Sequence, residues 1–204
     1  MSDEPWVEGA LTVKRTADMP NFDQLILTTR RLTLRPLAAS DTASLFAIFS
    51  DARVMRYWSS APWPSIEKAH EMIAKDAAAL AAGEHLRLGM ETVADGRLIG
   101  QCSLFNFNAQ CQRCDIGYGM AFDSWGHGYM HEALTAVLDY GFAELGLNRV
   151  EADIDPRNAA SAKTLARLAF QNEGFLRERW VVDGEVSDSG IYGLLRRDWL
   201  ARTP

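Results

Sequence analysis

Hydrophobic and polar residues change their spacing several times along the chain, and each change predicts the start of a new element. Large apolar residues that alternate with polar or small ones predict strands, whereas apolar residues three and four positions apart predict helices. The alternating stretches, and therefore the predicted strands, are residues 32–35, 86–91, 98–107, 115–122, 150–154, 175–182 and 186–195.

Helical spacing occurs in four stretches between these strands. The predicted helices span residues 41–50, 65–83, 129–145 and 158–168. Asp95-Gly96 and Asp183-Gly184 are strong signals for tight hairpin turns. Hairpins join antiparallel strands and a helical connection joins parallel ones. The order therefore predicts a mixed sheet with a parallel step around the helix at 129–145.

The first two dozen residues differ from the rest of the chain. Pro5, Gly9 and Pro20 interrupt any regular spacing there. We therefore expect an N-terminal arm over residues 1–24 and a single domain over residues 25–204, which is an ordinary length for one domain.

Charge and composition exclude several classes of protein. The 204 residues include 27 Asp and Glu against 21 Lys and Arg, so the net charge is −6. No basic surplus exists to bind nucleic acid or an anionic membrane. No apolar run approaches the ~18 residues of a membrane span, and the acidic start MSDEPWVEG is unlike a signal peptide. These features predict a cytoplasmic protein with neither nucleic acid nor membrane as a partner.

Cysteines and histidines are too few and too scattered to predict a disulfide framework or a metal site. The cysteines are three, an odd number, and the four histidines have no metal-ligand spacing. Cys111 and Cys114 form a CxxC in the predicted connection between two strands, with no second pair to complete four ligands. We expect them to be reduced surface thiols.

The segment between the strand at 115–122 and the helix at 129–145 is the first candidate site. Its two glycines, Gly126 and Gly128, can turn backbone N–H groups toward an anion at the positive end of the helix, and a diphosphate is the usual occupant. A tight strand-to-helix turn also needs glycines, so the turn alone leaves both interpretations open.

The segments DIGYGM, WGHGYMHEAL, ADIDPRNAASAKTL and IYGLLRRDW, in this order, resemble the GNAT superfamily of acyl-CoA-dependent N-acetyltransferases, and within it the RimJ/RimL type that modifies protein N-termini. LTTRRLTLRPLAASD and SDARVMRYW are similar too, so the resemblance covers about Leu27 to Trp199. It implies an α/β fold of mixed α+β character, with a splayed, mixed sheet of six to seven strands and helices on both faces.

The resemblance also implies acetyl-CoA as the co-substrate, and the scattered histidines predict no metal. The turn would cradle the CoA diphosphate, the preceding strand would pair with pantetheine, and a polar pair would lie on the acceptor side of the cofactor. Met130 stands where relatives have a small residue, and we favour a packing role for it because it opens an apolar stripe. The expected cofactor-binding residues are Met120, Phe122, Trp125, Gly126, His127, Gly128, Tyr129, Met130, Asn158 and Ser161.

The acceptor is expected to be a primary amine. The subfamily resemblance favours a protein N-terminal α-amine, while a polyamine, amino acid or drug would use the same machinery. A non-catalytic acyl-CoA-binding module is the alternative from another class. Arg56, Tyr57, Trp58 and Trp63 are candidates for the lip of the acceptor pocket, with ordinary packing under the loop as the alternative.

Catalysis in such an enzyme is a direct attack of the amine on the thioester, and Ser161 is expected to donate a hydrogen bond to the departing sulfur. Some relatives place a Glu base where Trp180 stands here, so Glu178, two residues earlier on the same face of a regular strand, is the substitute candidate. A solvated charge run is the alternative for Glu178. The last two strands also supply an edge that would allow a homodimer.

Overall fold

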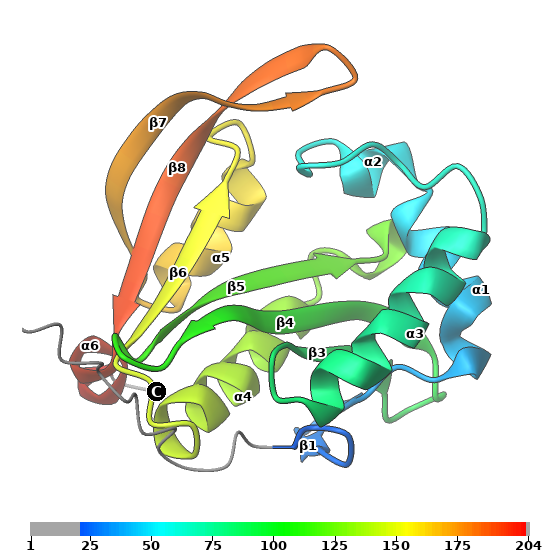
Figure 1. Ribbon diagram of the computed structural model, residues 1–204, viewed down its shortest axis with the longest axis horizontal. Helices are drawn as coiled ribbons and strands as arrows, with labels where there is room; N and C mark the ends of the chain where they lie inside the picture. The colour runs from blue at the N-terminus through cyan, green and yellow to red at the C-terminus, as the bar shows by residue number, and fades with distance from the viewer. Residues whose placement is uncertain (1–20, 203–204) are drawn as a thin grey trace, which may run out of the picture.

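The computed structural model describes residues 21–202. Its centre is one eight-stranded sheet in the order β1-β2-β3-β4-β5-β6-β8-β7 (Figure 1). The strands are β1 (Leu27–Thr28), β2 (Leu32–Arg35), β3 (Leu86–Thr92), β4 (Leu98–Asn108), β5 (Arg113–Met120), β6 (Arg149–Ile154), β7 (Gln171–Val182) and β8 (Glu185–Leu195). The helices are α1 (Thr42–Phe49), α2 (Ala52–Met55), α3 (Glu67–Ala81), α4 (Tyr129–Ala143), α5 (Ala159–Arg167) and α6 (Arg196–Ala201), with 3-10 turns η1 (Ala39–Asp41) and η2 (Phe122–Ser124).

The predicted order of the long elements is confirmed. The sheet has eight strands rather than six to seven because β1 is only two residues long, too short to show an alternation of apolar and polar positions. The helices α2 and α6, of four and six residues, are likewise too short for a helical period to be recognised.

The sheet is splayed between β5 and β6. These strands run parallel, as the helix α4 between them predicts, and they pair only where Arg113–Asp115 meets Arg149–Glu151. Beyond Asp115 the strands separate, and Figure 1 shows the resulting fork. On its other side β5 stays paired with β4 as far as Met120. One edge of β5 therefore faces the fork without a strand partner.

Helices cover both faces of the sheet, as predicted. On one face, α4 and α5 contribute to a core in which Leu134 and Leu165 pack with the strand residue Ile116. On the other face, α1 and α3 form a second cluster around Phe49. Gly119 allows this close packing, because a Cβ at that position would lie 2.8 Å from Trp58 and 3.2 Å from Phe49.

The predicted exposure of one cysteine is wrong. Cys111 is exposed, but Cys114 is completely buried, because the alternation of β5 directs it to the same face as Ile116. Burial raises the pKa of the Cys114 thiol, so the thiol is protonated and unreactive at neutral pH.

The predicted arm, residues 1–24, lies largely outside the described residues. Its end is part of the domain, since Phe22 is buried in the core and its backbone N–H donates to the carbonyl of Leu80 at 3.0 Å. Phe22, which falls within the predicted arm, therefore packs against the domain.

Candidate active site

The free edge of β5 presents backbone groups to the fork. The N–H of Ala121 donates to the carbonyl of Ile99 in β4 at 2.8 Å. Because neighbouring residues of a strand point their backbone groups in opposite directions, the N–H and C=O of Met120 face away from β4. The indole Nε1–H of Trp125 donates to the Met120 carbonyl at 2.8 Å, which leaves the Met120 N–H available to a ligand.

The turn after β5 has the backbone conformation that an anion site needs. Gly126 and Gly128 have φ angles of +80° and +78°, which side-chain-bearing residues rarely adopt. Gly128 is the N-cap of α4, and no side chain caps the helix there. The first N–H groups of α4 therefore remain available at the positive end of the helix dipole, which suits a diphosphate.

One predicted cofactor residue lies elsewhere than expected. Phe122 is not on the strand, because β5 ends at Met120 and Phe122 begins the η2 turn with its ring 42% exposed. Its ring lies under the guanidinium of Arg53 at 4.0 Å. Met130 is buried in the core, as its packing interpretation expects. The side chains of Trp125, His127 and Tyr129 surround the turn itself, and the rings of His127 and Tyr129 are 6.0 Å apart.

The start of α5 brings a polar pair to the fork. Asn158 caps the helix, since its Oδ1 accepts from the backbone N–H of Ser161 at 3.0 Å. The Ser161 hydroxyl is buried and lies 2.7 Å from the hydroxyl of Tyr118 on β5. Burial raises the pKa of Tyr118 to about 12, so its phenol is neutral and can donate a hydrogen bond at physiological pH. The strand pattern places Tyr118 on the large-residue face, but nothing in the sequence singles out its contact with Ser161.

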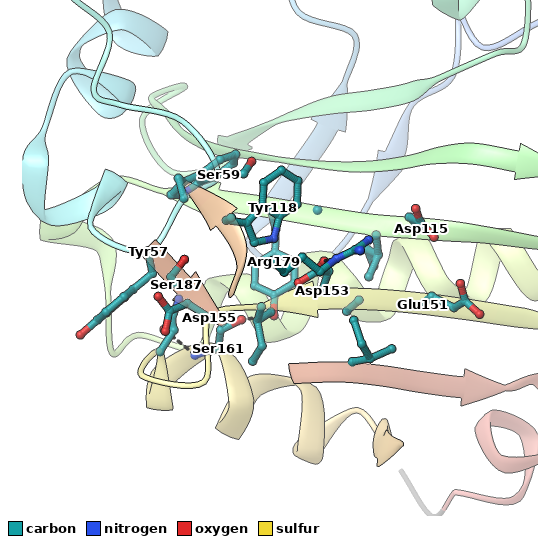
Figure 2. A pocket seen from close by; sticks show the side chains of 18 of the residues that line it. Tyr57, Ser59, Asp115, Tyr118, Glu151, Asp153, Asp155, Ser161, Arg179 and Ser187 are labelled. Carbon is teal, nitrogen blue, oxygen red and sulfur yellow. Dashed lines mark hydrogen bonds and ion pairs between the residues drawn. The ribbon is translucent and has the colours of Figure 1, made fainter. Parts of the chain in front are cut away.

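A cavity of about 400 Å³ lies in the fork. Its lining comes from β4, β5 and β6, from the start of α5, from the segment between α2 and α3, and from the β7–β8 hairpin. Figure 2 shows Tyr118 and Ser161 close together, with Tyr57 and Ser187 near the same end and Arg179 reaching across from the hairpin. The partly buried pair of hydroxyls therefore lies against a cavity.

The four predicted acceptor residues divide into three groups. Tyr57 and Trp58 line the cavity. Arg56 lines an adjoining hollow and forms an ion pair with Glu185 at 3.4 Å. Trp63 lines neither space; its ring stacks on Phe49 at 4.9 Å in the second core cluster. Trp63 thus packs in the core, as its alternative interpretation expects.

Each carboxylate that lines the cavity has an arginine partner. Two of the pairs are Asp153 with Arg179 at 3.0 Å and Asp155 with Arg157 at 2.6 Å. The hydrogen bonds from Arg157 lower the pKa of Asp155, so this carboxylate is ionised and engaged at neutral pH. The other pairs are Glu151 with Arg149 at 2.6 Å and with Arg113 at 2.9 Å, and Asp115 with Arg113 at 3.9 Å.

Glu178 lies outside the residues that line the cavity. The regular strand assumed for it is wrong: the β7–β8 register shifts between Leu176 and Trp180, and Glu178 has a φ of +51°. Its side chain is exposed, and its backbone N–H donates to Asp188 at 2.7 Å. The bulge instead turns Arg179 and Trp180 toward the cavity.

Residues 21–202 offer neither a cluster of metal-ligating side chains nor a membrane-spanning helix. This part of the chain contains no group of three or more His, Cys, Asp or Glu that could hold a metal ion. None of its helices is long and apolar enough to cross a bilayer.

The splayed sheet, the uncapped glycine turn and the hydroxyl pair beside a cavity together form a candidate site for acyl transfer. The acetyltransferase (GNAT) domain family matches residues 31–171 of the chain. The chain therefore belongs to this family and is an acyl-CoA-dependent N-acetyltransferase.

Individual relatives agree with this assignment. An uncharacterized N-acetyltransferase, p20, from Bacillus licheniformis is 34% identical over 85% of this chain and 97% of its own length. The [ribosomal protein uS5]-alanine N-acetyltransferase of Escherichia coli is 30% identical over 57% of this chain and 61% of its own length. The fold matches spermidine N-acetyltransferase from Vibrio cholerae, solved with CoA and spermine, with a TM-score of 0.75 and 23% identity, over 84% of this chain and 99% of that one.

Proposed function

We propose that the protein transfers the acetyl group of acetyl-CoA to a protein N-terminal α-amine. The observation that carries this choice of acceptor is the pairing of every cavity carboxylate with an arginine. An amine with a pKa near ~10.4 needs a base to become a nucleophile, whereas an α-amine with a pKa of ~7.7 to 8.0 is already partly neutral at pH 7.5. The cavity therefore suits an α-amine, which does not depend on a side-chain base to become a nucleophile.

The curated relatives also support a protein N-terminus as the acceptor. The Escherichia coli relative is named for acetylation of an alanine of a ribosomal protein. The Vibrio cholerae structure, named for spermidine and holding spermine, matches at 23% identity. A polyamine with several positive charges would need unpaired carboxylates, and the cavity of this chain offers carboxylates that arginines already neutralise.

In the reaction we propose, the neutral amine attacks the thioester carbonyl directly. The Met120 N–H donates to the carbonyl oxygen as negative charge develops there. The attacking nitrogen becomes positively charged and loses one proton to water, and the tetrahedral intermediate collapses as the C–S bond breaks and the thiolate leaves. Ser161 donates a hydrogen bond to the departing sulfur, and Tyr118 in turn donates to Ser161.

The hydroxyl pair stabilises the thiolate without protonating it. A thiol has a pKa near ~8.5, well below the pKa of about 12 of Tyr118. Transfer of the phenolic proton to sulfur is therefore unfavourable, and the pair acts through hydrogen bonds. Glu178 is exposed outside the cavity, so the proposed reaction routes no proton through it.

Three acceptors test the proposal: a lysine-free peptide with a free N-terminus, a peptide with a blocked N-terminus and one internal lysine, and spermidine. Release of free thiol measures turnover, and mass spectrometry locates the acetyl group. We expect the first acceptor to have a kcat/KM at least tenfold above the other two. Turnover of spermidine alone would replace the proposed acceptor by a polyamine. A thermal shift with acetyl-CoA but no thiol release with any acceptor would indicate a binding module.

A further inference from the structure

Arg31, in the connection between β1 and β2, reaches the glycine turn in front of α4. Its Nη1 donates to the carbonyl oxygen of His127 at 2.9 Å. Its guanidinium also lies over the ring of Tyr129, 4.5 Å from the centroid. The two contacts lie on either side of Gly128, so one side chain from the β1 edge of the sheet holds both sides of the turn.

Glu132, in the first turn of α4, fixes the orientation of this guanidinium. One carboxylate oxygen accepts from Arg31 Nε at 2.6 Å, and the other accepts from the Arg31 backbone N–H at 2.8 Å and from Thr29 Oγ1 at 2.6 Å. Burial alone would raise the pKa of Glu132, but the hydrogen bonds from Thr29 and Arg31 lower it, so the carboxylate is ionised. Arg31 is therefore held at both Nε and Nη1.

The remaining nitrogen of the guanidinium points to the turn. A Cβ built on Gly128 would lie 3.5 Å from Arg31 Nη2, and Nη2 has no hydrogen-bond partner in residues 21–202. The Arg31 side chain is 41% exposed. Glu132 largely balances the charge of Arg31. Arg31 would therefore bind a phosphate through well-directed N–H groups rather than through long-range electrostatic attraction.

We propose that Arg31 is a positioning residue of the acetyl-CoA site. It holds the His127 carbonyl, so that the Gly126–Gly128 turn keeps its amides toward the diphosphate, and it directs its own Nη2 to a phosphate oxygen. The inference rests on the proposed use of acetyl-CoA at this turn. A planar guanidinium is required, because a lysine ammonium cannot meet Glu132, His127 and a phosphate in these three directions.

The choice of acyl donor separates this role from a structural one. S-acetylpantetheine has the same thioester and pantetheine arm as acetyl-CoA but lacks the diphosphate. For Arg31→Met we expect the KM for acetyl-CoA to rise at least tenfold with kcat nearly unchanged, while kcat/KM for S-acetylpantetheine stays within twofold of the native value. Arg31→Lys should reverse less than half of this rise in log KM for acetyl-CoA.

Arg30→Met is the matched control. Arg30 is the exposed neighbour of Arg31 and forms no hydrogen bond or ion pair within the described part of the chain, so its removal should leave both donors unaffected. Turnover of S-acetylpantetheine also reports that each variant is folded. An equal loss with both donors, or no loss with either, would overturn the role of Arg31. Failure of the native protein to consume any thioester would instead refute the proposed function.

Discussion

Removing the two hydroxyls beside the cavity, singly and together, tests how the leaving thiolate is stabilised. Ser161→Ala removes the group that faces the sulfur, and Tyr118→Phe removes only the hydroxyl 2.7 Å behind it. A hydrogen bond to a charged group contributes about 1.5–3 kcal/mol, which corresponds to a fall in kcat of about 10- to 150-fold for Ser161→Ala. Tyr118→Phe leaves the serine in place, so its loss should be smaller, about three- to tenfold.

The double variant carries the sharper prediction. If Tyr118 acts through Ser161, Tyr118→Phe should cost nothing further once Ser161 is alanine, and the double variant should have the kcat of Ser161→Ala. Saturating thiol-release assays measure kcat. Losses that multiply in the double variant would mean that each hydroxyl reaches the sulfur independently, and would refute the relay.

Stability should follow a different order. Ser161→Ala removes the hydrogen-bond partner of the partly buried Tyr118 hydroxyl, at a cost of about 0.5–1.5 kcal/mol in the free energy of unfolding, whereas the double variant removes both members and should recover part of that loss. Urea unfolding measures the free energy of unfolding of each variant. Thr164→Ala is the control on the same helix, because its hydroxyl is exposed and binds the backbone carbonyl of Ala160.

Three further changes probe the turn, the proposed absence of a side-chain base, and a buried histidine. Gly128→Glu should weaken acetyl-CoA at least tenfold in calorimetry, because the residue has a φ of +78° and the new carboxylate would compete with the diphosphate. Glu178→Gln should keep the native pH profile of kcat/KM, and a selective loss at neutral pH would restore Glu178 as the base. Burial, assisted by Arg87, lowers the pKa of His85 from 6.5 to about 4. The unfolded chain therefore binds the extra proton first, and stability should fall by about 1–2 kcal/mol as the pH drops from 7 to 5. His85→Leu should reduce this dependence of stability on pH, measured by urea unfolding at each pH. An unchanged dependence would mean that other titrating groups cause it.

Local patterns in the sequence were sufficient for most of the scaffold. Strand and helix periods depend on neighbours a few positions away, so the order of elements and the parallel step around α4 could be derived from them. The turn at Gly126 and Gly128 and the cap at Asn158 are also local, since backbone conformation and a contact three residues away define them. The motifs that resemble the family lie on these same segments.

Register and bulges decided the contacts that sequence reasoning missed or misplaced. The position of Glu178 depends on a bulge in β7, and the end of β5 at Met120 places Phe122 outside the strand. Both follow from how one strand pairs with its neighbour, and a shift of one residue reverses the side that a residue faces.

Long-range contacts produced the chemistry of the site. Tyr118 and Ser161 are 43 positions apart, and Arg31 and Glu132 are 101 apart, yet each pair is joined by a hydrogen bond shorter than 3 Å. No periodic pattern connects such residues, because their proximity arises only when the sheet splays and α4 and α5 pack on its face. The sequence by itself therefore determined the elements and the turn that suits the cofactor, while tertiary packing decided which hydroxyls, arginines and carboxylates meet.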